Sequence, residues 1–387
     1  MDYGLTETQI MIQDVCRQVA EEKIKPVREH YDEANEFPRE LLPVFAQADL
    51  CGLYIGEAYG GMGGGVMDLC VAVEELSKVC SGIALSIAAT ALGTFPIILF
   101  GNDEQKRTYL PRIAKGQCLA AFALTEPNAG SDAGAIATTA TRDGDTYVLN
   151  GTKQWITNGG EAEVYTVVAK TDKTRGARGA SAFIVEKGTP GFTFGKKENK
   201  MGIRASATRE LIFQDCRIPK ANLLGKEGMG FLVAMKTFDQ SRPGVAAQAL
   251  GIAAGALDEA VRYSRERRQF GKPICSFQGV QFMLADMATQ VEAARALVYQ
   301  AARAIDAGQK DISKISAMCK LFASDTAMRV TTDAVQIFGG YGYMKEYPVE
   351  KMMRDAKITQ IYEGTNQIQR EVIGLSLIKE AAAKKKT

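Results

Sequence analysis

The sequence predicts a mostly helical protein of the α+β class, with an N-terminal helical domain, a middle antiparallel β domain and a C-terminal four-helix bundle. Three observations predict this order. Residues 1–116 carry apolar side chains at helical spacing, residues 117–227 carry short runs rich in Val, Ile, Thr, Phe and Tyr between turn signals, and residues 228–387 return to helical spacing. Strands and helices do not alternate in the middle region, which disfavours a doubly wound nucleotide-binding fold.

The first domain is expected to be built from helices. Thr6 and Gln9 have the spacing of a capping box, and apolar residues then recur from Ile12 in steps of three and four. Two further helices are expected over residues 67–80, after a glycine-rich turn, and over residues 83–100, which are rich in Ala and Leu.

The middle domain is expected to be a small antiparallel sheet. Its strand-like runs are separated by turn signals such as Asp143-Gly144 and Pro190-Gly191. The expected strands lie within residues 118–124, 146–149, 164–169, 182–185 and 210–213.

The last domain is expected to be a bundle of long helices, because a helical apolar repeat continues over many turns. The clearest part of that repeat is Leu284, Met287, Val291, Ala294 and Leu297.

The composition excludes several classes of function. The 47 basic and 45 acidic residues leave a formal charge of +2, too balanced for a nucleic-acid binder. Only one histidine, His30, is present among charged neighbours, which excludes multi-histidine metal sites and histidine-based proton transfer. The eight cysteines form no CxxC pair and are expected to be reduced, as in the cytoplasm. We expect no secretory signal and no membrane span, since the apolar stretches fall short of about 20 residues.

Two segments of the middle domain have residues suited to a ligand. The loop that contains Thr125 and Ser131 combines hydroxyls with small residues that let a backbone approach a ligand, although an ordinary polar turn has the same composition. Trp155, the only tryptophan, and Thr157 share one face of a strand, where an indole beside a hydroxyl suits a flat aromatic ligand. A lone tryptophan is equally often part of a core.

Two segments near the C-terminus are also unusual. A helix is expected to end at Gly339 and Gly340, in a chain reversal that lacks the lysine of a P-loop. Glu363 precedes Gly364 and follows Ile361 and Tyr362, so its carboxyl could act as a base with a raised pKa in an apolar pocket. In isolation, an acidic residue that begins a helix is the better explanation of this pattern.

Taken together, these motifs identify a resemblance to the acyl-CoA dehydrogenases over essentially the whole chain. The resemblance rests on five motifs in the family order, namely residues 123–135, 155–160, 267–272, 336–355 and 362–367. It implies the acyl-CoA dehydrogenase fold and an FAD enzyme that forms a homotetramer.

The resemblance also implies the residues that contact FAD. Those expected near the flavin and its ribityl chain are Phe122, Leu124, Thr125, Ser131, Trp155, Thr157, Thr365 and Gln367. Those expected to reach the adenine and diphosphate half across a subunit boundary are Arg267, Gln269, Phe270, Gln278, Gln336, Gly339 and Gly340. Gln269 stands where many relatives have Thr, and it can still form a hydrogen bond.

For the substrate, the resemblance implies an acyl-CoA thioester whose CoA arm contacts Ser131, Phe238, Asp239 and Arg242, with Gly364 beside the thioester. Glu363 matches the base that removes the α-proton while a hydride leaves the β-carbon for the flavin, giving the 2,3-enoyl-CoA. Electrons then pass to an electron-transfer flavoprotein.

The resemblance implies that residues 86–92 line the pocket for the acyl group, and four of these seven residues are Ser or Ala. These small side chains suggest a short or medium chain, a branched chain or a six-membered ring. Three alternatives remain open: an acyl-CoA oxidase or a flavin monooxygenase on the same fold, and a non-enzymatic protein that binds flavin or CoA.

Overall fold

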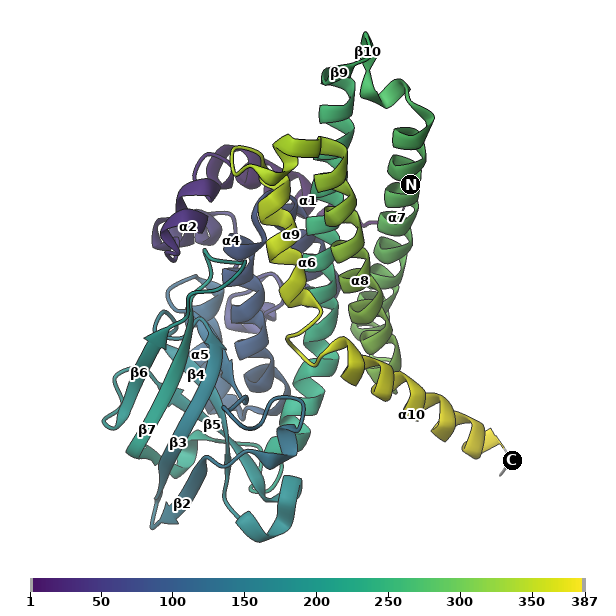
Figure 1. Ribbon diagram of the computed structural model, residues 1–387. Coiled ribbons are helices and arrows are strands. Elements are labelled where there is room, and N and C mark those ends of the chain that lie inside the picture. Colours follow the sequence, from purple (N-terminus) through teal and green to yellow (C-terminus); the bar gives the residue numbers. More distant parts are fainter. Residues whose placement is uncertain (1–2, 385–387) are drawn as a thin grey trace.

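The structure is a computed structural model that describes residues 3–384. It confirms the predicted order of a helical part, a β part and a helical bundle (Figure 1). Met1 and Asp2, on which part of the prediction about a signal segment falls, lie outside the described residues. The N-terminal helices are α1 (Glu7–Val19), α2 (Arg28–Ala34), α3 (Leu42–Gln47), α4 (Val66–Phe100) and α5 (Asp103–Ala114), with a π-helical turn at Ala20–Ile24 and 3-10 turns at Arg39–Leu41 and Glu57–Tyr59.

Helix α1 begins as its sequence predicts. The Thr6 hydroxyl accepts a hydrogen bond from the backbone N–H of Gln9 (3.2 Å), and the Gln9 side chain accepts one from the Thr6 N–H (3.1 Å). This reciprocal pair satisfies two N–H groups that a helix start otherwise leaves without partners. The buried face of α1 is made by Ile12, Cys16 and Val19.

Helix α4 joins the two helices expected over residues 67–80 and 83–100, with a kink at Cys80, whose φ is −155°. The expectation that no apolar stretch is long enough to span a membrane is wrong for α4, because one 18-residue window has a mean hydropathy of 2.1. A helix that is apolar on all sides lies either in a membrane or in the core of a large protein. Here 72% of that window is buried inside the protein, and α4 packs along α6, so it occupies the position of a core helix.

In the described part of the chain, eight strands form one sheet in the order β6-β7-β3-β2-β4-β5-β8, with β1 beside β4. The five predicted strands are present, whereas β2, β6 and β8 were not predicted. The expectation of a wholly antiparallel sheet is wrong, because β1 runs parallel to β4, with Ala120 opposite Val164. The β2–β3 hairpin lies between these two strands in the chain and provides the long crossover that a parallel pair requires. The strands are β1 (Ala120–Ala123), β2 (Thr139–Asp143), β3 (Thr146–Thr157), β4 (Val164–Lys170), β5 (Ala180–Glu186), β6 (Phe192–Lys197), β7 (Thr208–Pro219) and β8 (Leu223–Leu224).

The C-terminal part is a bundle in which α6, α7 and α8 lie side by side (Figure 1). A short β9–β10 hairpin lies at one end of the bundle, and α10 leads away from the other end. Helix α8 ends at Phe338, and Gly339 follows with a φ of +62°, as the glycines predict. The elements are α6 (Gly230–Glu266), β9 (Arg268–Gln269), β10 (Lys272–Pro273), α7 (Gln278–Asp306), α8 (Ser313–Phe338), a 3-10 turn at Gly339–Tyr343, α9 (Pro348–Thr359) and α10 (Asn366–Lys384).

Candidate active site

Two adjoining cavities lie between the β sheet and the C-terminal bundle. The first, of about 420 Å³, extends along α4 and α6, and the second, of about 640 Å³, extends along the 198–203 segment and α9. They share a wall made by Thr125, Gly130, Ser131, Trp155, Thr157, Tyr362, Glu363 and Gly364. Both volumes are within the range of small-molecule sites.

Most residues predicted for the flavin and the thioester meet at these two cavities. The first cavity is lined by Phe122, Leu124, Phe238 and Arg242 in addition to the shared wall, and Thr365 lines the second. Segments from the β domain and from three helical regions therefore converge on one place, although they lie far apart in the sequence.

The residues predicted for the adenine and diphosphate lie elsewhere. Arg267, Gln269, Gly339 and Gly340 line a third cavity of about 530 Å³, beside the β9–β10 hairpin. Helix α6 connects the two regions, and at about 1.5 Å per residue its stretch from Ser241 to Glu266 spans about 38 Å. The two groups of residues thus lie far apart along one long helix.

Some predicted residues line none of these three cavities. Phe270 is 92% exposed at the tip of the hairpin, and Gln278, Gln336 and Gln367 are also exposed. Asp239 is buried beside its neighbours instead of facing a cavity, because its carboxylate accepts hydrogen bonds from Arg242 (3.4 Å) and from the Ser313 hydroxyl (2.6 Å).

The position of Trp155 depends on an irregular strand. The pairing of β3 with β7 shifts between Lys153 and Ile156, and Trp155 itself has a φ of +56°. Such a bulge re-aims a side chain out of the regular alternation of a strand. The indole is accordingly 57% exposed at the shared wall of the two cavities, so it is not a core residue.

A buried ion pair fixes the loop that follows β1. The ammonium of Lys153 donates to the Glu126 carboxylate (2.7 Å) and to the Leu124 carbonyl (2.9 Å). Glu126 also accepts the backbone N–H groups of Ala137 (2.6 Å) and Thr138 (3.0 Å). A buried pair with its remaining hydrogen-bond sites satisfied holds both chain segments in one arrangement.

Glu363 lies on the loop between α9 and α10. Its φ is +53° and that of Gly364 is +88°, two consecutive left-handed residues that turn the carboxyl toward the cavities. The Ser241 hydroxyl donates to this carboxylate (2.8 Å). Burial raises the pKa of Glu363 to about 7, against the opposing effects of the Ser241 hydrogen bond and the charges of Arg242 and Lys320.

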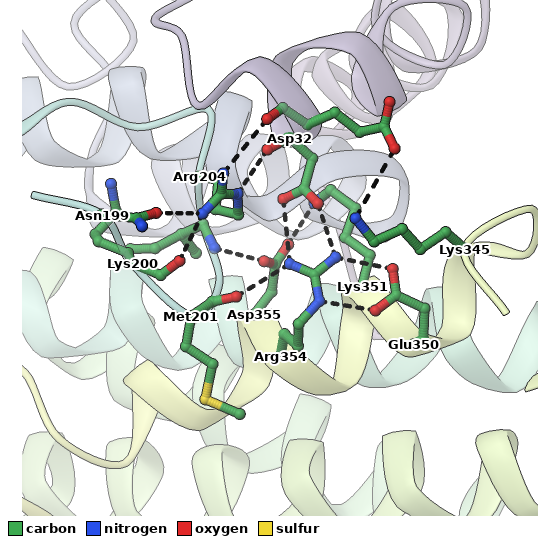
Figure 2. Close-up of polar contacts among 12 residues, drawn as sticks. Asp32, Asn199, Lys200, Met201, Arg204, Lys345, Glu350, Lys351, Arg354 and Asp355 are labelled. Carbon is green, nitrogen blue, oxygen red and sulfur yellow. Dashed lines mark hydrogen bonds and ion pairs between the residues drawn. The ribbon is translucent and has the colours of Figure 1, made fainter. Parts of the chain in front are cut away.

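Helix α9, which precedes this loop, is anchored by its own charged side chains and one from α2 (Figure 2). We call Asp32, Glu350, Lys351, Arg354 and Asp355 the α9 network. Arg354 donates to Asp32 (2.7 Å) and to both oxygens of Glu350 (2.7 and 2.8 Å), and Lys351 pairs with Asp355. Asp355 also accepts the backbone N–H of Ile203, which lines the second cavity, so the network joins α2, α9 and the cavity wall.

Sequence reasoning missed three buried polar residues that surround Glu363. Ser241 directly precedes Arg242, which was predicted to contact the substrate, so its position in the sequence could have indicated a role at the site. Lys320 and Gln369 lie behind the loop, and both are fully buried. A lysine among small residues on the buried face of a predicted helix is a signal that the sequence did contain.

The hydrogen-bonding side chains at the two cavities suit the predicted FAD. An exposed indole and the hydroxyls of Thr125, Thr157 and Thr365 offer a stacking surface and hydrogen bonds for a flat ring system with a polar chain. Over residues 3–384, no cluster of His, Cys, Asp or Glu has the arrangement of a metal site.

Comparison with protein families finds three matching models along the chain. The N-terminal, middle and C-terminal domain models of acyl-CoA dehydrogenase match residues 6–117, 121–216 and 228–378. The acryloyl-CoA reductase (NADH) of Anaerotignum propionicum is 54% identical over 98% of this chain and 96% of its own length.

Solved structures agree with that result. The butyryl-CoA dehydrogenase of Megasphaera elsdenii superposes with a TM-score of 0.95 and 51% identity, over 98% of this chain and 100% of that one. A chain from a study of the electron transferring flavoprotein of Acidaminococcus fermentans superposes with a TM-score of 0.95 and 56% identity, over 97% and 99% of the two chains.

Proposed function

Because the chain belongs to the acyl-CoA dehydrogenase family, whose members are FAD-dependent enzymes, we propose that it catalyses the α,β-dehydrogenation of a short-chain acyl-CoA thioester. The observation that carries the proposal is the carboxyl of Glu363. It lies in the wall shared by both cavities, and its pKa is raised to about 7, which is where a general base works at neutral pH.

In this proposal the residues of the chain bind, orient and move one proton. The backbone N–H of Glu363 polarises the thioester carbonyl, which makes the α-proton acidic, and the Glu363 carboxylate removes that proton. FAD, when bound by Thr125, Trp155, Thr157 and Thr365, supplies the acceptor for the hydride of the β-carbon. The product is the 2,3-enoyl-CoA.

Reduction of an enoyl-CoA, the reverse reaction, would use the same residues of the chain. Because the pKa of Glu363 is near 7, the carboxyl is protonated in a large fraction of molecules at neutral pH and can return a proton to the α-carbon. The relative from Anaerotignum propionicum is named an acryloyl-CoA reductase, which favours reduction of an enoyl-CoA as the second candidate function.

Tyr362, which lines the first cavity, is held by buried polar groups. The Tyr362 hydroxyl donates to the side chain of Gln248, which in turn donates to the Ser81 hydroxyl (2.7 Å). Gln248 and Ser81 are buried, so this hydrogen-bonded chain holds Tyr362 in place beside Leu85 and Ala89, which line the same cavity with apolar side chains.

The small residues at positions 86–92 give weaker support for a branched or alicyclic group than the sequence suggested. Ala88, Ala89 and Leu92 face the cavity, whereas Ser86 turns away and donates to the Ile83 carbonyl (2.8 Å). The butyryl and acryloyl names of the relatives also favour a short straight chain.

We further propose a cytoplasmic homotetramer that passes electrons to an electron-transfer flavoprotein. All eight cysteines are free and all except Cys275 are buried, as in a reducing compartment. Within one copy, about 38 Å of α6 separates Ser241, which donates to Glu363, from the Arg267 region, so the two lie far apart. The Arg267 region is therefore assigned to the FAD of a second copy.

The experiment is anaerobic flavin reduction, followed by absorbance, with butyryl-, octanoyl-, isobutyryl- and cyclohexanecarbonyl-CoA. We expect the fastest reduction with butyryl-CoA. In the Glu363→Gln variant, FAD is retained and reduction falls by about 10³-fold, since removing a general base typically costs 10²–10⁴-fold.

Normal reduction in Glu363→Gln would refute the assignment of the base, and preferential reduction by the cyclohexanecarbonyl thioester would refute the short-chain proposal. Rapid peroxide formation when air is admitted to the reduced enzyme would instead identify an oxidase. A purified protein without flavin absorbance would favour a non-enzymatic binding protein.

A further inference from the structure

Lys320 is a buried cation that the proposed reaction does not use. It lies on α8, its side chain is fully buried, and its ammonium donates to the Gly364 carbonyl (2.8 Å) and to the side-chain oxygen of Asn366 (2.9 Å). No carboxylate of the described residues lies within ion-pair distance of this ammonium. A lysine buried without a carboxylate partner is unusual enough to require an explanation.

The contact with Gly364 places Lys320 directly behind the proposed base. The loop reverses through Glu363 and Gly364, both with positive φ, and Glu363 is not a residue that adopts this conformation readily. Two side chains hold the carbonyls of this reversal from the rear: Gln369 donates to the carbonyls of Glu363 (3.1 Å) and Gly364 (2.9 Å), and Lys320 donates to that of Gly364. The peptide planes are thereby fixed with the Glu363 carboxyl facing the cavities.

Asn366, the first residue of α10, connects Lys320 to the middle of α8 and to the end of α9. Its side chain donates to Asp325 (2.7 Å) and to the Ser324 hydroxyl (2.9 Å), and its backbone N–H donates to the Gln360 carbonyl (3.0 Å). The ammonium of Lys320 is therefore held in one place and cannot move to follow a charge elsewhere.

Few charges face Lys320 and Glu363. Arg242 comes from α6, Asp325 comes from α8 and pairs with Arg370, and Tyr362 is a buried hydroxyl whose pKa is raised by burial and by Glu363. Burial lowers the pKa of Lys320 to about 7, while the Glu363 carboxylate raises it, Arg242 lowers it and Asp325 raises it. The ionised carboxylate and the protonated ammonium thus favour one another.

We propose that Lys320 is a positioning residue for the base: it fixes the Gly364 carbonyl and places a buried positive charge behind the loop, which favours the ionised, proton-accepting form of Glu363. The inference rests on the proposed function, since it requires Glu363 to be the base. Gln369 contacts the same carbonyl without a charge, so the two residues separate the effect of the charge from that of the hydrogen bond.

The test compares Lys320→Met with Gln369→Met, each loaded with FAD and reduced anaerobically by butyryl-CoA between pH 5.5 and 9. Both variants lose a hydrogen bond to Gly364. We expect only Lys320→Met to move the midpoint of the rate–pH profile, upward by about one pH unit, because an opposite charge nearby lowers the pKa of a carboxyl by one or more units. Its rate is then about tenfold below wild type at pH 6 and equal to it near pH 9.

A Lys320→Met profile with the wild-type midpoint, or equal shifts in both variants, would overturn the inference. If Lys320→Met does not retain FAD, Lys320→Gln, which keeps a donor and lacks the charge, must show the same upward shift. Glu363→Gln is measured in parallel: normal reduction there refutes the proposed function itself, whereas loss of reduction there together with an unshifted Lys320→Met refutes only the role of Lys320.

Discussion

Two charged regions, one on helix α9 and one around the loop that follows it, differ in how completely their charges are paired. In the α9 network, Arg354 has two carboxylate partners and Lys351 pairs with Asp355, all partly or fully buried. In the loop after the helix, the Glu363 carboxylate has one neutral donor, Ser241, and the cations Lys320 and Arg242 make no ion pair with it.

The difference determines which groups change protonation near neutral pH. The hydrogen bonds of Glu350, and then Asp32, raise the pKa of Arg354 despite burial, and for Lys351 the charge of Asp355 outweighs burial and raises the pKa too. Burial without such pairing instead brings the pKa of both Glu363 and Lys320 to about 7. Complete pairing fixes structure, whereas incomplete pairing leaves a group able to accept and release a proton.

The largest effect is expected for Arg354→Met. It leaves the buried Asp32 and the partly buried Glu350 without their cation, so we expect the free energy of unfolding to fall by about 3–5 kcal/mol. Urea unfolding measures this loss, and Arg217→Met, which breaks an exposed pair with Asp143, should cost less than about 1 kcal/mol. An equal loss in the two variants, or a moved rate–pH midpoint in Arg354→Met, would contradict the contrast.

A smaller effect of opposite sign is expected for Glu363→Gln. A carboxyl whose pKa rises from 4.5 to about 7 on folding destabilises the folded state once pH exceeds 4.5, and the full cost is present above pH 7. The variant should therefore be more stable than wild type by about 1–3 kcal/mol at pH 8 and nearly equal to it at pH 5. Urea unfolding at both pH values checks this, with Glu380→Gln on the surface as the control; a gain independent of pH would count against it.

The smallest effect is expected for Ser241→Ala. Without this hydroxyl, the ionised carboxylate loses a hydrogen bond, so the pKa of Glu363 rises further and flavin reduction by butyryl-CoA slows about tenfold at pH 6. The deficit should vanish near pH 9. Ser264→Ala on the same helix removes a buried hydroxyl that donates only to the Val261 carbonyl (2.9 Å), and it should leave the profile unchanged.

The sequence predicts the parts of this molecule whose signals are local. The capping residues of α1, the glycines after α8 and the apolar repeat of α7 each predict an element within a few residues. Trp155, Thr157 and Glu363 stand in compact motifs, so the centre of the candidate site could also be predicted.

Contacts between distant segments could not be predicted in the same way. Asp32 and Arg354 are 322 residues apart, and neither has a neighbour that reveals the other. The parallel pairing of β1 with β4 depends on the route of the chain across the sheet. Lys320 differs from a surface lysine only because tertiary packing buries it behind Gly364.

The length of α6 has a consequence for how the cofactor is kept. If the Arg267 end of one copy binds the FAD of its neighbour, neither copy alone contains a complete FAD site. Retention of FAD then depends on protein concentration. A substitution that disrupts the β9–β10 hairpin of one subunit would lower the flavin absorbance of its neighbour. The flavin becomes a reporter of assembly as well as of catalysis.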